Sequence, residues 1–141
     1  MLRIVSAFLL LQHGSAKLLG FPRVAYFDNL QIVSLLGAAG TLELVGGVLL
    51  LIGLFTRPTA FILSGLLAFA YFLGHATKGF VLVPFLNQGE AAVLFSFVFL
   101  YIAAAGPGPW SVDARRAKSA AADRARARCR VVGCFGYMQL T

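Results

Sequence analysis

Residues 35–53 read LLGAAGTLELVGGVLLLIG, and this stretch decides the fold. It contains one charged residue, Glu43, and five glycines within an otherwise apolar run. The apolar segment around it, at about residues 30–55, is long enough to cross a bilayer as a helix. Glycines in such a helix let another backbone approach closely. The predicted helix-packing positions are therefore Gly37, Gly40, Gly46, Gly47 and Gly53.

Three further apolar segments accompany this one, at about residues 4–20, 58–74 and 88–105. The chain of 141 residues is 60% hydrophobic and 12% charged, whereas soluble domains carry about 25% charged residues. We therefore expect an all-α membrane protein, with a four-transmembrane-helix bundle in residues 1–113. Residues 114–141 are predicted to form a separate basic tail.

The tail holds most of the positive charge, because seven of the twelve Lys and Arg residues lie after position 114. It has no interleaved aromatic residues for base stacking, so nucleic acid is not an expected partner. We predict that both termini are cytoplasmic, because nine basic residues then face inward and three outward, as the positive-inside rule requires. We expect a multi-pass protein of the inner (plasma) membrane. The predicted lipid or partner contacts are Arg57, Trp110, Arg115, Arg116 and Lys118.

The structure of the tail is less constrained by its sequence. Ser111 or Asp113 is a candidate N-cap for a helix through ARRAKSAAADRARARCR, which lacks an apolar stripe. We expect either a surface helix or disorder there, and disorder over residues 131–141.

Ionisable residues inside the apolar segments are the candidates for function. A lysine at the centre of a membrane helix costs about 2.5–3.5 kcal/mol on insertion scales, so it tends to persist where it has a partner or a task. In the predicted topology Glu43 lies deepest, and the other ionisable side chains approach the outer face. We expect a polar pocket that binds a ligand or relays protons. Its predicted members are Glu43, Lys17, His75, Glu90 and His13.

Five short motifs, in order, resemble the DoxX family of small four-helix membrane proteins. They are HGSAKLLGF (13–21), ELVGGVLLLIGLFTR (43–57), His75, NQGEAAVLF (87–95) and GPGPWSVD (106–113). The resemblance spans about residues 3–113 and departs at Pro109, where a basic residue is common in the family. The positions that match the family pattern are Gly14, Lys17, Glu43, Gly46, Gly47, Gly53, Arg57, His75, Gly89, Glu90, Gly106, Gly108, Ser111 and Asp113.

The resemblance implies a membrane subunit of a quinone-linked or thiol- and sulfur-linked oxidoreductase assembly, more than an enzyme acting by itself. It implies membrane or soluble redox proteins as partners, with quinone or lipid as the ligand classes. A homo-oligomer is compatible with the sequence. No catalytic residue is identified, and the spacing of Cys129 and Cys134 does not predict a metal site.

Three other interpretations stay open. The buried charges could be structural ion pairs that hold the helices in register. The protein could be a membrane anchor or scaffold without chemistry, docking an acidic partner through its tail. In the third interpretation, His13 and His75 are the axial ligands of a b-type haem.

Overall fold

The computed structural model describes residues 1–24, 34–78 and 81–138, and within these ranges the chain is helical, with no strand. The α-helices in chain order are α1 (Leu2–Leu18), α2 (Leu35–Ile52), α3 (Thr56–Ala70), α4 (Glu90–Ala105) and α5 (Val112–Met138). Helix α3 continues without a break into a π-helical turn, η2 (Tyr71–His75), and a 3-10 turn, η3 (Ala76–Lys78).

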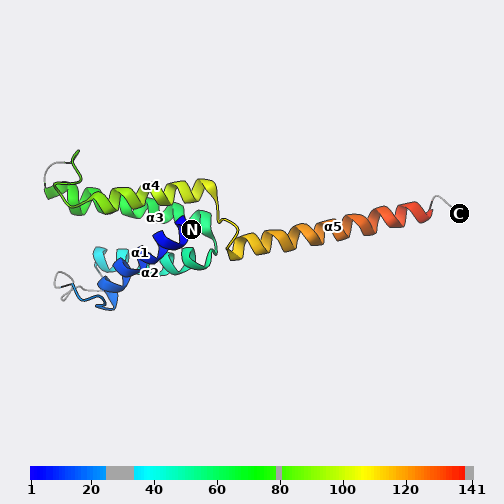
Figure 1. Ribbon diagram of the computed structural model, residues 1–141, viewed down its shortest axis with the longest axis horizontal. Coiled ribbons are helices and arrows are strands. Elements are labelled where there is room, and N and C mark those ends of the chain that lie inside the picture. The colour runs from blue at the N-terminus through cyan, green and yellow to red at the C-terminus, as the bar shows by residue number, and fades with distance from the viewer. Residues whose placement is uncertain (25–33, 79–80, 139–141) are drawn as a thin grey trace.

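Helices α1 to α4 lie side by side as a bundle, and α5 leaves one end of it (Figure 1). Helix α1 packs along α2, and α3 packs along α4. The shared core is built from alanines, branched aliphatic residues and one phenylalanine, which come from all four helices. Its members are Ala7, Leu10, Leu50, Ala60, Leu63, Leu67, Phe99 and Ile102.

The helix boundaries differ from the predicted segments for local reasons. Helix α2 begins at Leu35 because the Ser34 hydroxyl accepts a hydrogen bond from the Gly37 amide at 3.1 Å, and residues 30–33 lie outside the described ranges. Helix α3 begins at Thr56, so Pro58 still lies in the first turn, where its missing N–H has no cost. Helix α4 begins at Glu90, two residues later than predicted, because the backbone at Gln88 is left-handed, with φ 59°.

Two helical stretches are long and apolar enough to cross a membrane. They are Leu35–Ile52, with 18 residues, and Thr56–His75, with 20 residues. Helix α4 is also apolar, but it is shorter, with 16 residues. Large apolar side chains cover the outside of the bundle, and several are more than half exposed. Examples are Val5, Phe8, Val45, Phe61, Phe69, Phe72, Leu94 and Phe97.

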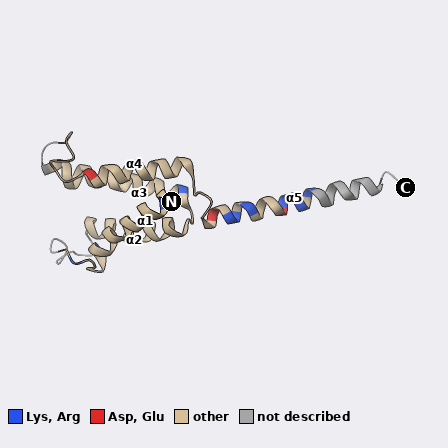
Figure 2. Ribbon diagram, in the orientation of Figure 1, with Lys and Arg blue, Asp and Glu red and all other residues tan. Residues whose placement is uncertain are grey.

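Helix α5 is the opposite kind of helix. Its described side chains are polar or small, and blue Lys and Arg positions follow one another along it (Figure 2). It begins because the Ser111 hydroxyl accepts a hydrogen bond from the Ala114 amide at 3.1 Å. The helix also runs through residues 131–138, where we expected disorder, and residues 139–141 lie outside the described ranges.

Candidate functional site

Lys17 of α1 and Glu43 of α2 form a buried ion pair. The Lys17 ammonium donates to both carboxylate oxygens of Glu43, with Nζ 2.6 Å from Oε1 and 2.7 Å from Oε2. The Glu43 side chain is 2% exposed and that of Lys17 is 14% exposed. Among the described residues this is the one ion pair, so each charge in this part of the bundle depends on the other.

Glycines set the distance between the two helices that carry the pair. A Cβ atom at Gly14 would lie 2.7 Å from the backbone nitrogen of Leu44, and one at Gly40 would lie 3.0 Å from the Lys17 Cβ. Because side chains lean toward the N-terminus of their own helix and α1 runs antiparallel to α2, Lys17 and Glu43 lean toward each other. The close contact of α1 and α2 therefore places the pair.

The other predicted packing glycines also lie in contacts. A Cβ at Gly46 would meet Leu63 of α3 at 2.9 Å, and one at Gly47 would meet Leu11 of α1 at 2.9 Å. Gly37 is buried near the start of α2. Gly53 ends α2 in the left-handed conformation, with φ 73°, which a larger residue adopts only at a cost.

The remaining members of the predicted polar pocket are not joined to this pair by a hydrogen bond or ion pair within the described residues. His13 is exposed on α1, and its ring lies edge-on to Phe95 of α4 at a centroid distance of 6.3 Å. Glu90 is exposed at the start of α4. The structure thus brings Lys17 and Glu43 together and gives His13, Glu90 and His75 other surroundings.

His75 belongs to a second polar group, the Tyr71 cluster, made of Tyr71, His75, Asn87 and Gly89. His75 Nδ1 lies 3.1 Å from the Asn87 carbonyl oxygen, and the Tyr71 and His75 rings stack. The Asn87 amide donates to the Tyr71 hydroxyl at 3.2 Å, and its Oδ1 accepts from the Gly89 amide at 2.9 Å. A carbonyl only accepts, so His75 Nδ1 carries the proton of this bond.

Tyr71 and Asn87 are buried and were not among the sequence candidates. Two signals point to them. Asn87 directly precedes the Gly-Glu start of α4, and Tyr71 lies one turn before His75. The π-helical turn that separates Tyr71 from His75 is a feature often found at functional sites, but its position is not readable from the sequence.

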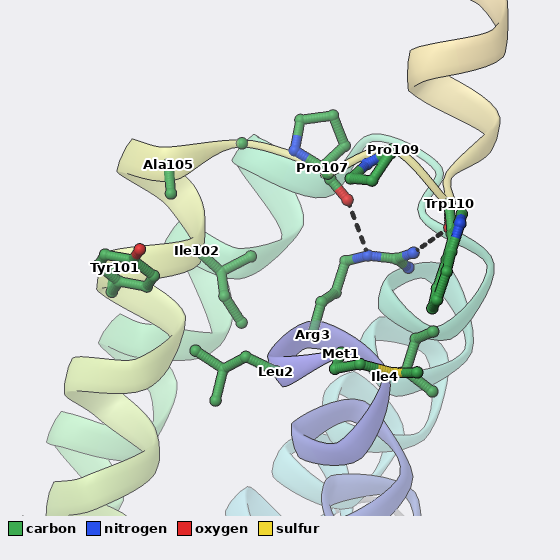
Figure 3. A pocket seen from close by; sticks show the side chains of 12 residues that line it. Met1, Leu2, Arg3, Ile4, Tyr101, Ile102, Ala105, Pro107, Pro109 and Trp110 are labelled. Carbon is green, nitrogen blue, oxygen red and sulfur yellow. Dashed lines mark hydrogen bonds between the residues drawn. The ribbon is translucent and has the colours of Figure 1, made fainter.

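A third polar group, the Arg3 cluster, lies at the end of the bundle from which α5 leaves. It consists of Arg3, Ser111, Asp113 and the backbone groups that they bind. The Arg3 guanidinium donates to the carbonyl oxygens of Leu50 and Leu51 in α2 and to those of Pro107 and Trp110 in the linker before α5 (Figure 3). Arg3 therefore fastens the start of α1 to both of these segments, a role that the sequence did not indicate.

Asp113 performs the complementary task with backbone amides. Its carboxylate accepts from the amides of Phe55 and Thr56 at 3.1 and 2.8 Å, and its own amide donates to the Gly53 carbonyl at 3.0 Å. Burial alone would raise the pKa of Asp113, but the hydrogen bonds from Thr56 and Phe55 and the nearby Arg116 charge hold this pKa below its usual value. The first turn of α5 is thereby attached to the start of α3.

The predicted lipid or partner contacts lie around this same end. Trp110 is 65% exposed. Arg57, Arg115, Arg116 and Lys118 are exposed as well. Among the described residues, no three His, Cys, Asp or Glu side chains gather as a metal site. The structure gives His13 and His75 different neighbours, and the haem interpretation stays a prediction.

Two comparisons found similarity between this chain and known proteins. A family model described as DoxX matches residues 1–76, which include Lys17, Glu43 and His75. A protein of Haemophilus influenzae, described as uncharacterized, is 46% identical over 99 residues, which is 69% of this chain and 74% of the relative. No solved structure matches the chain.

Proposed function

The chain belongs to the DoxX family, and from that premise we propose that it is a four-span inner-membrane protein serving as the membrane subunit of an oxidoreductase assembly. The observation that carries the proposal is the Lys17–Glu43 ion pair, in which two ionisable groups that can exchange a proton lie in apolar surroundings. The redox partner, quinone-linked or thiol- and sulfur-linked, follows from the family resemblance.

The proposed topology has both termini in the cytoplasm. Arg3 near the start of α1 binds the Trp110 carbonyl just before α5, so the two ends of the bundle domain lie on one side, as an even number of crossings requires. Helices α1 and α4 span about 26 and 24 Å at 1.5 Å per residue, slightly less than a hydrocarbon core of about 30 Å. Local thinning of the bilayer and flanking residues accommodate such a difference. The basic α5 then satisfies the positive-inside rule.

The Lys17–Glu43 pair has zero net charge in two arrangements. In one, both groups are ionised, and in the other a proton has moved from the ammonium to the carboxylate. The ammonium nitrogen lies within 2.7 Å of both carboxylate oxygens, which gives a proton a direct path between the two groups and suits the pair to proton exchange with a bound carrier. An ammonium and a carboxylic acid also donate to carbonyl oxygens, the acceptors of a quinone ring. The proposed role of the pair is to bind such a ring or to pass a proton to it.

The test separates a functional pair from a structural one. We compare Glu43→Gln, Lys17→Met and the double variant in membranes that contain the redox partners, measuring quinone reduction and, separately, the amount of assembled protein. A single change leaves one buried charge without its partner, and the double variant removes both. A functional pair predicts that the double variant assembles normally and that its turnover falls about 100-fold, the usual size of a lost acid–base group.

Two outcomes oppose the proposal. Full turnover in the double variant would assign the pair to helix register alone. Unchanged turnover in both single variants would show that the pair takes no part in the reaction. Gln12→Ala provides a matched control, because Gln12 is exposed on the same helix and its side chain is not bonded to the pair.

A second candidate function is a scaffold without chemistry, and the projecting basic α5 favours it. Beyond its first turn, α5 projects away from the bundle (Figure 2), and its described Lys and Arg side chains are exposed, where they can meet an acidic partner. Pull-down with the full chain and with a chain ending at residue 113 discriminates between the two functions. Partners that are lost with residues 114–141 support docking through α5, and retention of every partner excludes it.

A further inference from the structure

A groove lies at the end of the bundle from which α5 leaves, between α1 and α4, and the Lys17–Glu43 pair is not part of it. Its volume is about 370 Å³, within the usual range of about 300–1,000 Å³ for ligand pockets. Leu2 of α1 faces Tyr101 and Ile102 of α4, Ile4 lies beneath Trp110, and the linker of residues 106–110 arches over the space between them (Figure 3). The walls are therefore mostly apolar, and the roof is backbone.

Arg3 shapes this groove without being available to a ligand. Its guanidinium already donates to four carbonyl oxygens, two of them in the arch, at Pro107 and Trp110. These bonds hold the linker above the first turn of α1, so the space between the linker and α1 stays open. A positive charge that is available to a ligand therefore has to come from another residue.

Arg57 supplies that charge. It is exposed, and a Cβ atom at Gly106 in the arch would lie 3.3 Å from both its Nε and one of its terminal nitrogens. Within the described residues, no hydrogen bond or ion pair holds the Arg57 guanidinium. The nearest described carboxylate on α5, Asp113, is occupied by the amides of Phe55 and Thr56. A free guanidinium thus lies beside Gly106, one of the residues that line the apolar groove.

Two aromatic side chains mark the level of the groove. Tyr101 is 62% exposed and Trp110 is 65% exposed, and both line it. Tyr and Trp concentrate where the hydrocarbon of a bilayer meets the headgroups. In the proposed topology this end of the bundle lies at the cytoplasmic headgroups, beside the basic residues of α5 (Figure 2).

We propose that the groove between α1 and α4 binds one anionic phospholipid, with an acyl chain against Leu2, Ile102 and Ala105 and the phosphate at Arg57. The apolar walls select a lipid over a soluble phosphate, and the guanidinium selects an anionic headgroup over a zwitterionic one. The inference uses the membrane topology of the proposed function but is independent of any redox role.

The experiment uses the full chain purified in phosphatidylcholine nanodiscs, alone or mixed with an equal amount of phosphatidylglycerol. Native mass spectrometry counts the phospholipids that remain bound after the protein is released from the nanodisc. The wild-type chain is expected to retain one phosphatidylglycerol in preference to phosphatidylcholine. Arg57→Gln should reduce that preference about five-fold, as expected for a loss of about 1 kcal/mol per basic residue at the membrane surface.

Two further variants sharpen the result. Ala105→Phe fills the groove without changing charge and should abolish retention of both lipids. Arg124→Gln removes one positive charge from α5 far along the helix and should leave retention at the wild-type value. Far-UV circular dichroism, which measures helix content, verifies that each variant is folded.

Three outcomes would overturn the proposal. They are equal retention of the two lipids by the wild-type chain, equal losses in Arg57→Gln and Arg124→Gln, and displacement of the bound lipid by inorganic phosphate. The Lys17→Met/Glu43→Gln double variant should retain phosphatidylglycerol as the wild-type chain does. A failure of the redox proposal therefore leaves this test intact.

Discussion

The Arg3 cluster and the Lys17–Glu43 pair hold buried charge in two different ways. Arg3 and Asp113 bind backbone carbonyls and amides from several segments, and these partners cannot change protonation. Lys17 and Glu43 bind each other through side chains alone. Charge tied to the backbone fixes architecture, whereas charge paired only with another ionisable side chain keeps the freedom to exchange a proton or a partner.

The largest expected effect comes from Arg3→Met. The change leaves four carbonyl oxygens without their donor, and hydrogen bonds to a charged group contribute about 1.5–3 kcal/mol each without adding fully. We expect the free energy of unfolding to fall by about 4 kcal/mol. Trp110, the single tryptophan of the chain, reports the change directly, because its carbonyl is one of the four partners. An unaltered Trp110 emission and midpoint would contradict the architectural role.

Glu43→Gln should cost less, about 2–3 kcal/mol, because one unpaired ammonium at 14% exposure regains part of its solvation. The double variant with Lys17→Met should recover most of that loss. Thermal unfolding followed by circular dichroism measures both, and Trp110 emission should stay unchanged in the folded variants. Equal losses in the single and double variants would mean that the two charges are not coupled.

Gly14→Ala tests how the pair is positioned. The added Cβ would lie 2.7 Å from the Leu44 nitrogen, so α1 and α2 must separate, and we expect a loss of about 1–3 kcal/mol. Gly65→Ala is the matched control on α3, because nothing lies within 4 Å of its Cβ. It should be neutral or stabilise the helix by about 0.5–1 kcal/mol. Similar midpoints for the two variants would refute the close contact of α1 and α2.

The smallest effect is expected from Asp113→Asn, about 0.3–1 kcal/mol near neutral pH, as for the loss of other negative charges at a helix N-terminus. The lowered native pKa of Asp113 sets the sign of the pH dependence. The carboxylate stabilises the folded chain above its unfolded pKa of about 3.9, and this contribution disappears as pH falls through the lower native value. Unfolding curves of the two proteins should therefore begin to approach each other below about pH 4 and coincide below the native pKa. A difference that persists in acid would assign the effect to shape instead of charge.

Local sequence features were sufficient to predict the four helices of the bundle. The apolar segments, the Pro58 start and the isolated Glu43 follow from composition and helix propensity. Lys17 and Glu43 both stand in apolar runs and carry opposite charge, so each is the natural partner of the other. Their role in binding or proton transfer stays a prediction.

Contacts between distant segments were not predictable in this way. Arg3 binds Trp110, 107 residues further along the chain, and in the sequence it reads only as a positive charge at the start of a helix. The Tyr71 cluster depends on a π-helical turn that rotates Tyr71 toward Asn87. The tail was ambiguous because its alanines and arginines favour a helix while its lack of an apolar stripe gives that helix nothing to pack on.

The attachment of Asp113 to α3 has a mechanical consequence. Helix α5 has 27 residues, so it extends about 40 Å from a base that is bonded to the first amides of α3. A change of about 10° in the direction of that base would sweep the far end of α5 through about 7 Å. The tail is thus a lever arm, which converts a small tilt at the α2–α3 corner into a much larger displacement at its far end.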